Sequence, residues 1–516
     1  MKLSKFTPFH PFLFCIYPIL YLYSINQIET PIVDIIMPIF ISIGITTLLI
    51  ISWKFLFKDL KRGALIITVL LVVIFSYGHI YEILNSDLVN TEIRHRYLLL
   101  LFLIFFITLT MIIIKKVKSQ NLNLILNVVG ISLIVILLPN FLLFENTSNL
   151  LEEITNDNLS NTYSDFYILK DTNLLKSDNR PNIFYILLDG YGGTKRMNED
   201  LNFDNYVFLD ELKSRGFIVS DNSNSNYASS KWSLTSIMNM VYLPSIELNQ
   251  TDNEHAELLS FMLSNNEVMR NLKILDYEII DFQPEGFFIK SFSNIDRNYC
   301  SQEVIEQSKF VKTLLRTTIL NLLNHNLQID SDRKSILCGF SETSKLLDDN
   351  TSPLFVNMHL RLPHPPYVFG PNGEFIYPGR VQTEEGSFEN EQGYVDSIKF
   401  ANSKVIPLID EILIKDKNAI IIIQSDHGYD FGIDYENPSI LSLKQRFSNL
   451  NAIYYPFENN VFYDGFTPVN TFSIIFNNIF ETDYPILEDR MFYHPYGGSY
   501  IYKQPKFIDV TEKILN

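Results

Sequence analysis

The chain has 516 residues, a formal net charge of −17 and three cysteines. Its length suits two or three domains, and its negative charge argues against nucleic-acid binding, which requires a basic surface. The first third consists mostly of long stretches with few charged residues, whereas the rest is rich in Asn, Asp, Ser and aromatic residues, as in a soluble domain. The two parts therefore call for separate interpretation.

The first third contains five apolar segments, each about as long as the roughly 20 residues that a membrane-spanning helix needs. They are residues 8–26, 32–53, 64–84, 97–114 and 122–143. The first segment has a basic start but no small-residue cleavage site, so we expect a retained anchor and not a cleaved signal peptide. We therefore predict a transmembrane region over residues 1–144 that anchors the chain in the lipid bilayer, with a lipid-handling helical bundle as the alternative.

The positions of Lys and Arg predict how these segments are oriented. Basic residues precede the first segment and lie between the second and third and between the fourth and fifth: Lys2, Lys5, Lys54, Lys58, Lys61, Arg62, Lys115, Lys116 and Lys118. The opposite loops are acidic or mixed, with Arg94 and Arg96 as a small exception. We expect a cytoplasmic N-terminus, five crossings of the inner or plasma membrane, and an extracytoplasmic location for everything after residue 144.

Residues 145–180 are rich in polar residues and are predicted to form a linker with one short helix near 148–155. From 181 to 516, strand and helix patterns alternate, which favours an α/β domain with a mainly parallel sheet covered by helices on both faces. The expected strands are residues 182–189, 217–222, 353–360 and 419–426, and the expected helices are 205–216, 233–243 and 391–415.

The cysteines leave two interpretations open. Cys15 lies in the first apolar segment. Cys300 and Cys338 are compatible with one disulfide if their domain lies outside the cytoplasm, and equally with two unpaired thiols. Nothing in their spacing indicates a metal site.

Two of the expected strands end in residues of types that bind metal ions. Asp189 ends the run at 182–189, and Asp426 with His427 ends the run at 419–426. Chemistry in open α/β sheets gathers at the carboxyl ends of the strands, so we expect these side chains to converge there. Two carboxylates and an imidazole suit one divalent ion, Zn, Mn or Mg. The alternative is a capped turn after each strand.

Ser230 follows a polar loop and begins a helical pattern. The backbone N–H groups and the dipole at a helix N-terminus favour an anion, and a metal bound to the hydroxyl oxygen would help to form the alkoxide. Ser230 is therefore our candidate for both the nucleophile and a metal ligand. The alternative is that Ser229 or Ser230 simply caps the helix.

His364 lies in a loop stiffened by Pro363, Pro365 and Pro366. An imidazole held in this way is suited to bind substrate oxygens or to protonate a leaving group. We interpret His359, which lies inside the preceding strand, as structural.

The order and spacing of several motifs resemble those of the alkaline phosphatase superfamily. They are "NIFYILLDGYG", "NYASSKWSLTSIMN", "LPHPPY", "SDHG" and "RFSNLNAIYYP". The closest resemblance is to the sulfatase-like branch of membrane-anchored enzymes, which includes lipoteichoic acid synthases and phosphoethanolamine and phosphoglycerol transferases. These transferases also carry five membrane helices before an extracytoplasmic catalytic domain.

The resemblance implies a role for each matching residue. Asp189, Asp426 and His427 correspond to metal ligands, Ser230 to the nucleophile, and His364 to a substrate-binding histidine. Arg446, which precedes "NLNAIYYP", is a candidate anion contact.

The sequence departs from true sulfatases at two points. Ser230 is followed by Lys231, Trp232, Ser233 and Leu234, so the Pro and Arg that direct oxidation to formylglycine are missing. Asp189 is followed by Gly190 and not by a second Asp, which favours a single transition metal over calcium.

The sequence thus predicts a membrane-anchored, metal-dependent hydrolase or transferase acting on phosphoesters of an envelope lipid or glycan. The alternatives are a sulfuric ester hydrolase and a catalytically silent protein that binds an envelope glycan or assembles with an envelope complex.

Overall fold

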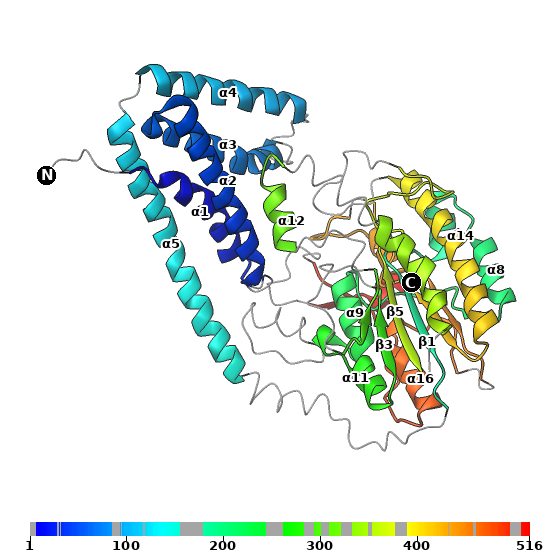
Figure 1. The fold of residues 1–516 in the computed structure, drawn as a ribbon. Coiled ribbons are helices and arrows are strands. Elements are labelled where there is room, and N and C mark those ends of the chain that lie inside the picture. Colours follow the sequence, from blue (N-terminus) through cyan, green and yellow to red (C-terminus); the bar gives the residue numbers. More distant parts are fainter. Residues whose placement is uncertain are drawn as a thin grey trace. The chain divides into compact units, whose positions relative to one another are not determined.

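A computed structural model shows two compact units (Figure 1), described here as the helical unit and the sheet unit. The helical unit comprises Met1–Phe166 and Gln307–Gln328, and the sheet unit comprises Tyr167–Glu306 and Ile329–Asn516. The structure describes residues 7–27, 30, 32–84, 93, 95–116, 119–154, 179–243, 262–282, 294–300, 309–320, 333–348, 353–376, 390–431, 433–457, 461–495 and 507–515.

All five predicted apolar segments form helices: α1 His10–Ser24, α2 Val33–Phe57, α3 Leu60–Leu84, α4 His95–Lys116 and α5 Ser119–Ile154. In the described residues, four helices are long and apolar enough to cross a membrane, and they lie in α2, α3, α4 and α5. With 15 residues and an internal Pro18, α1 is shorter than the roughly 20 residues that a crossing needs. Five helices are therefore present, and four of them meet the requirement for a span.

The helices α1, α3 and α5 are joined by buried polar side chains. The His10 Nδ1 lies 2.6 Å from the Thr68 hydroxyl, and its Nε2 lies 2.8 Å from Asn123 Oδ1. Asn127 Oδ1 accepts the His10 backbone N–H at 2.8 Å. Each of these contacts satisfies a polar group that is costly to bury alone. His10, which interrupts the first apolar segment, thus serves to join three helices.

The first part of the predicted linker is helical, where the sequence predicts only a short helix near 148–155. Helix α5 continues to Ile154, so residues 145–154 are helical. Residues 155–178 of the predicted linker lie outside the described part of the chain.

The sheet unit is built on a seven-stranded sheet with the order β2-β7-β6-β1-β5-β3-β4. Its strands are β1 Ile183–Leu188, β2 Phe217–Val219, β3 Glu278–Asp281, β4 Arg297–Asn298, β5 Leu354–Leu360, β6 Ile420–Gln424 and β7 Asn451–Tyr454. Only β7 pairs antiparallel with its neighbours; the other pairings are parallel. The central strands β1, β5 and β6 are buried throughout, as expected for continuous apolar runs in a parallel sheet. The prediction of a mainly parallel sheet is confirmed.

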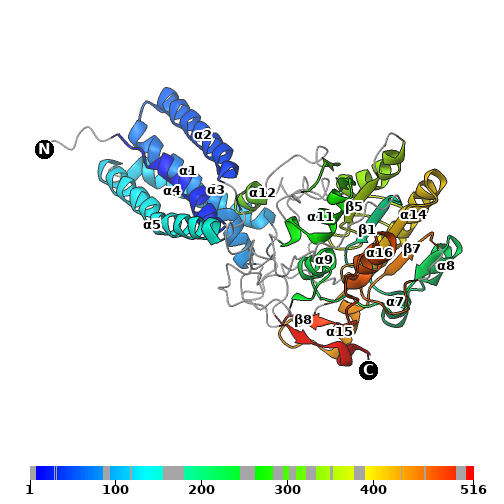
Figure 2. The ribbon, with the colours of Figure 1, turned by 90° about the horizontal axis from the view of Figure 1, so that it is seen from below.

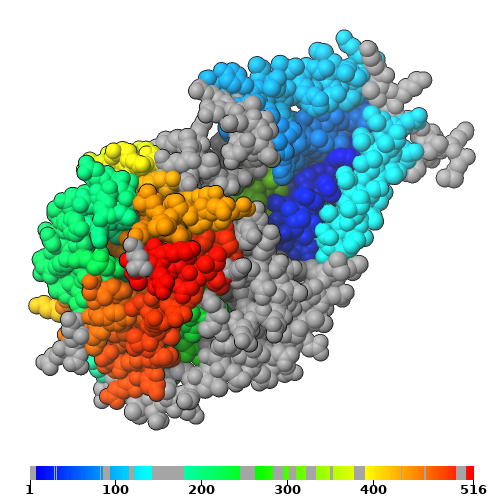
Figure 3. Space-filling model, turned by 180° about the vertical axis from the view of Figure 1, so that it is seen from behind, coloured from blue at the N-terminus to red at the C-terminus, as the bar shows by residue number. Residues whose placement is uncertain are grey.

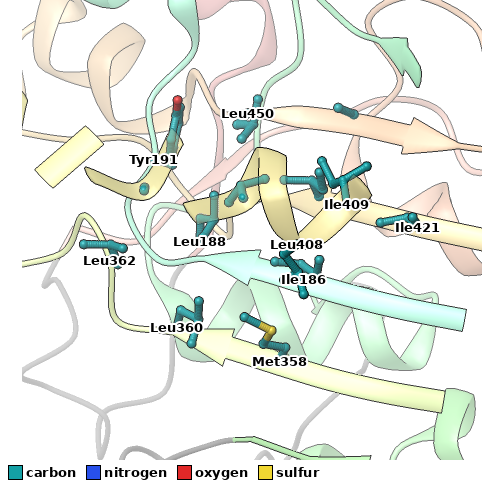
Figure 4. Packing of buried hydrophobic residues seen from close by; sticks show 14 of the residues in the cluster. Ile186, Leu188, Tyr191, Met358, Leu360, Leu362, Leu408, Ile409, Ile421 and Leu450 are labelled. Carbon is teal, nitrogen blue, oxygen red and sulfur yellow. The ribbon is translucent and has the colours of Figure 1, made fainter. Parts of the chain in front are cut away.

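Helices cover both faces of this sheet, as predicted (Figure 1). On one face, α8 Tyr206–Ser214 and α14 Glu391–Lys415 pack against β1, β5 and β6. Figure 4 shows this core, with Leu408 and Ile409 of α14 beside Ile186 of β1. The other face carries α9 Ser230–Asn239, α11 Glu267–Ile274 and α16 Thr471–Ile479. Successive β1 side chains alternate between the two cores.

Smaller elements complete the description. They are α7 Thr194–Leu201, α12 Lys309–Arg316, α15 Ile440–Phe447, α17 Thr511–Leu515, the 3₁₀ helices Thr343–Leu347 and Pro468–Asn470, and a two-stranded sheet of β8 Phe492–Tyr493 and β9 Ile508–Asp509. The C-terminal α17, red in Figure 3, packs with α15 at the surface.

Cys300 and Cys338 form a disulfide with a Cα–Cα distance of 5.8 Å. It joins the residue two positions after β4 to the helical residues 333–342. Of the two interpretations left open by the sequence, the structure therefore has the disulfide and not two unpaired thiols. Cys15 is a free, buried cysteine in α1.

Candidate functional site

Three neighbouring strands, β1, β5 and β6, end at the same edge of the sheet, and the candidate site lies there. Leu187 of β1 pairs with His359 of β5 on one side and with Gln424 of β6 on the other. Asp189 follows β1 directly, and Asp426 follows β6 after one residue. Parallel pairing therefore places both carboxylates at the carboxyl edge, where α/β sheets bind ligands.

The turn after β1 depends on Gly190. Its φ of 76° lies in the left-handed region, which glycine adopts without steric cost. In this conformation its N–H donates to Asp426 Oδ1 at 3.1 Å. The turn thus connects the end of β1 to the end of β6.

The structure brings together the three residues that the sequence predicts as metal ligands. Asp189, Asp426 and His427 are buried, and each offers a ligand atom within 4.8 Å of the others. His427 Nε2 lies 3.4 Å from Asp426 Oδ2 and 3.7 Å from Asp189 Oδ1. They converge as expected, and their role as ligands stays a prediction.

The hydrogen bonding of His427 directs the lone pair of its Nε2 towards Asp189 and Asp426. Its Nδ1 lies 2.8 Å from the Gly428 carbonyl, which can only accept, so Nδ1 carries the proton. Nε2 is then the acceptor nitrogen facing the two carboxylates. Metal-binding histidines are commonly held by such a second hydrogen bond. Burial lowers the pKa of His427, and the positive charge of Arg446 lowers it further, so the imidazole is neutral at neutral pH.

The two carboxylates are poorly satisfied by the protein itself. Burial acts to raise the pKa of Asp189, but the charge that His364 and the neighbouring histidines gain at acidic pH, together with the His359 contact, brings the pKa below its usual range. Among the described residues, neither Asp189 oxygen accepts a hydrogen bond, and neither does Asp426 Oδ2. Buried charges are costly unless they are paired or bind a metal. The oxygen and nitrogen donors therefore fit a divalent metal ion.

Ser230 lies beside these residues. It is the buried first residue of α9, and its Oγ lies 3.1 Å from His427 Nε2. Ser229 occupies the N-cap position but makes no capping hydrogen bond with its side chain. The helix N-terminus offers backbone N–H groups and a favourable dipole to an anion at Ser230.

Arg446 extends from α15 towards His427 and Ser230. Its Nη2 lies 3.2 Å from His427 Nε2, and its Nε donates to the Ala228 carbonyl at 2.7 Å. Its Nη1 pairs with Asp430 Oδ2 at 2.9 Å. The sequence predicts an anion contact at Arg446 but gives no role to Asp430, although this carboxylate follows the "SDHG" motif closely. The ion pair holds a buried positive charge next to Ser230 and His427.

His364 lies in the proline-rich loop after β5, and its ring centroid is 6.4 Å from that of His427. Its Nδ1 lies 2.6 Å from the Pro365 carbonyl, so Nδ1 is the donor and Nε2 is the acceptor nitrogen of the neutral ring. Burial lowers the pKa of His364 to about 4, against the opposing charge of Asp189. The ring is therefore neutral at neutral pH and suited to accept a proton.

His359 contacts a candidate ligand, although the sequence suggests only a structural role. Its Nε2 lies 3.4 Å from Asp189 Oδ2, because the β1–β5 register sets it opposite Leu187. This contact orients the Asp189 carboxylate. The only sequence signal is a polar residue inside an apolar strand near the carboxyl edge.

No model of a known protein family matches the chain, and no curated protein sequence matches it. Among solved structures, the C-terminal periplasmic domain of EcEptC from Escherichia coli is similar, with 15% identity over 64% of this chain and 94% of that chain and a TM-score of 0.42. The same domain in complex with Zn is 13% identical over 65% of this chain and 94% of that chain, with a TM-score of 0.42. The integral membrane protein lipooligosaccharide phosphoethanolamine transferase A from Neisseria meningitidis is 12% identical over 91% of this chain and 95% of that chain, with a TM-score of 0.37.

The first prediction concerns metal content. We expect the full-length protein, purified after growth with Zn and Mn, to hold about one divalent ion per chain, as measured by elemental mass spectrometry. Asp426→Asn should lose most of this metal, because a neutral amide is a poorer ligand than a carboxylate. A chelator should lower the melting temperature of the wild type but not that of Asp426→Asn, because metal binding stabilises the folded state.

The matched control is Asp434→Asn. Asp434 is exposed and its Oδ1 accepts backbone N–H groups in a turn, which an amide oxygen also accepts. This variant should keep the metal and the response to chelator. A wild type that binds no divalent metal, or an Asp426→Asn variant that retains it fully, contradicts the metal site.

Proposed function

We propose that this chain is a membrane-anchored, metal-dependent hydrolase or transferase of the alkaline phosphatase superfamily that acts on phosphoesters of the cell envelope through Ser230. The observation that carries the proposal is the 3.1 Å distance between Ser230 Oγ and His427 Nε2. This contact joins a hydroxyl at a helix N-terminus to the group of Asp189, Asp426 and His427. The resemblance of the sequence motifs implies the same roles for these residues.

The reaction begins when Ser230 Oγ attacks phosphorus. An O–P bond to the serine forms as the hydroxyl proton passes to solvent. The bond to the leaving group breaks, and the departing alkoxide takes a proton from solvent. A divalent metal held by Asp189, Asp426, His427 and the Ser230 oxygen would favour the ionised hydroxyl and offset negative charge. The N-terminus of α9 faces the phosphoryl oxygens with its N–H groups.

Arg446 stabilises the negative charge on the phosphoryl group. Its guanidinium is fixed by the Ala228 carbonyl and by Asp430, so little reorganisation accompanies the reaction. Fixed donors of this kind stabilise developing charge more effectively than mobile water. Asp430 holds the guanidinium in place and has no contact with the phosphoryl group in this scheme.

His364 acts in the second half of the reaction. Its Nε2 is the acceptor nitrogen of a neutral ring, so it takes a proton from the incoming hydroxyl and does not supply one to the first leaving group. The incoming group is water in a hydrolase, or a sugar, lipid or protein hydroxyl in a transferase. Its attack on phosphorus releases Ser230.

Two features support an extracytoplasmic active site on an envelope substrate. Within the described residues, four helices are long and apolar enough to cross a membrane, and the Lys and Arg residues around them favour an extracytoplasmic location for residues 145–516. The Cys300–Cys338 disulfide suits an oxidising compartment. An enzyme held at the membrane surface meets envelope lipids and the glycans attached to them.

The topology is tested by fusing reporters after residue 178, beyond the described end of α5. A phosphatase reporter that folds only outside the cytoplasm should be active, and a fluorescent reporter that folds only inside should be dark. The same pair of reporters after residue 58, between α2 and α3, should give the opposite result. Cytoplasmic activity after residue 178 contradicts the proposed location.

The nucleophile is tested by the turnover of bis(p-nitrophenyl) phosphate by the metal-loaded full-length protein. Ser230→Ala should lower kcat by on the order of 10³-fold or more, because the covalent step is lost. Ser230→Thr should keep part of the activity, because it retains a hydroxyl. Both variants should contain the metal, since Asp189, Asp426 and His427 remain.

Ser229→Ala is the matched control and should be nearly as active as the wild type, because the Ser229 side chain makes no capping bond. If Ser229→Ala is inactive and Ser230→Ala is active, the nucleophile is Ser229 and not Ser230. If both variants are active, the covalent mechanism is wrong. Parallel assays with p-nitrophenyl sulfate distinguish a sulfuric ester hydrolase, and turnover of neither ester supports a silent binding protein.

A further inference from the structure

Helix α12, Lys309–Arg316, lies in the sequence between elements of the sheet unit but belongs to the helical unit. Both ribbon views show it beside α1, α2 and α3 (Figures 1 and 2). The chain therefore returns to the N-terminal helices about 150 residues after α5 ends. We call residues 309–320 the docking segment.

One face of α12 packs into an apolar cluster on these helices. Phe310 and Leu314 are four residues apart, so they lie on the same side of the helix, and both are buried. Their cluster includes Ile19, Leu22 and Tyr23 of α1 and Ile35 of α2, with Phe75 of α3 packed against it. Burial of these two large apolar side chains in the cluster therefore favours the docked position of α12.

The turn after α12 also bonds to the backbone of α3. The Gly78 N–H donates to the Thr317 carbonyl at 3.0 Å, and the Ile319 N–H donates to the Ile74 carbonyl at 3.1 Å. Residues 74 and 78 are four apart, and in an α-helix their N–H and carbonyl groups face each other along the axis. Two such bonds fix the docking segment at one position along α3.

The close approach requires a glycine at position 78. A Cβ there would lie 2.1 Å from the Arg316 carbonyl oxygen and 2.7 Å from the Thr317 Cα. These are backbone atoms, which cannot rotate away as a side chain does. By contrast, a Cβ on Gly44 in α2 would meet nothing within 4 Å. The absence of a side chain at Gly78 therefore leaves the space on α3 that the docking segment occupies.

The contacts fall at ends of the helices that the predicted topology assigns to one side. They involve the last third of α1, the start of α2 and the last third of α3. The distribution of Lys and Arg places all three ends outside the cytoplasm, on the side predicted for residues 145–516. The docking contacts and the charge distribution are independent observations, and they agree.

We propose that the docking segment is a second, non-covalent attachment of the sheet unit to the membrane helices, made by α12 on α1 and α2 and by the turn 317–319 on Gly78. The first attachment is the covalent connection through residues 155–178. The second attachment limits how far the sheet unit can move away from the bilayer. If the proposed function holds, it keeps Ser230 within reach of membrane-borne esters.

The test separates the two attachments. A specific protease site is inserted between residues 155 and 178 of the full-length protein, which carries an N-terminal affinity tag, and the protein is cut in mild detergent. In the wild type the C-terminal fragment should stay with the tagged helical fragment. Gly78→Ala should reduce the retained fragment by at least about tenfold, whereas Gly44→Ala should match the wild type, because its added methyl group meets no atom.

A second variant covers the case in which Gly78→Ala disturbs α3 itself. Leu314→Asp leaves the five N-terminal helices unchanged and should release the C-terminal fragment equally, because it buries a charge in an apolar cluster. In both variants the released fragment should keep the wild-type melting temperature. The proposal is overturned if the wild type separates on cutting, if both variants stay bound, or if Gly44→Ala releases as much as Gly78→Ala. None of these outcomes depends on turnover, so the docking proposal and the proposed function fail separately.

Discussion

Two carboxylates are buried side by side at the ends of two paired strands, and the rest of the site is arranged around their charge. Like charges about 4 Å apart repel by roughly 4 kcal/mol at the effective dielectric constant of a protein. The fold nevertheless sets Asp189 and Asp426 together, because β1 and β6 are parallel neighbours and the Gly190 turn joins their ends. A divalent cation bound between the two carboxylates would offset this repulsion.

The neighbouring side chains also affect the electrostatics around Asp189 and Asp426. His427 turns a neutral acceptor nitrogen to the carboxylates, and His359 contacts Asp189 from β5. Arg446 contributes a fixed positive charge and keeps Asp430 as its own counter-ion, so it remains next to the site without neutralising Asp189 or Asp426. Ser230 lies next to these charged groups at the start of α9. In the proposed mechanism, the metal would make this hydroxyl a better nucleophile than an isolated serine, and Arg446 with the α9 N-terminus would bind an anionic ester.

The sequence predicts the parts of this arrangement that depend on local pattern. The apolar runs at 183–188 and 420–424 form strands, and the long helix at 391–415 has the predicted bounds. Residue types at strand ends are enough to predict that Asp189, Asp426 and His427 lie together. The remaining features depend on tertiary pairing. The antiparallel direction of β7, the contact of His359 with Asp189 and the pairing of Asp430 with Arg446 follow from which strand lies next to which. The return of α12 to the N-terminal helices has only an amphipathic pattern as its local signal, and such a pattern does not identify the surface it binds.

The central claim is that Ser230 forms a covalent bond to phosphorus at this edge of the sheet. The most direct measurement is peptide mass spectrometry of the full-length, metal-loaded protein after rapid acid quenching during incubation with membranes of envelope phospholipids. The account predicts one phosphorus-containing adduct on the peptide that carries Ser230, and no adduct in Asp426→Asn. Turnover of these lipids with Ser230 unmodified at every quench time, or an adduct on another residue, would contradict it.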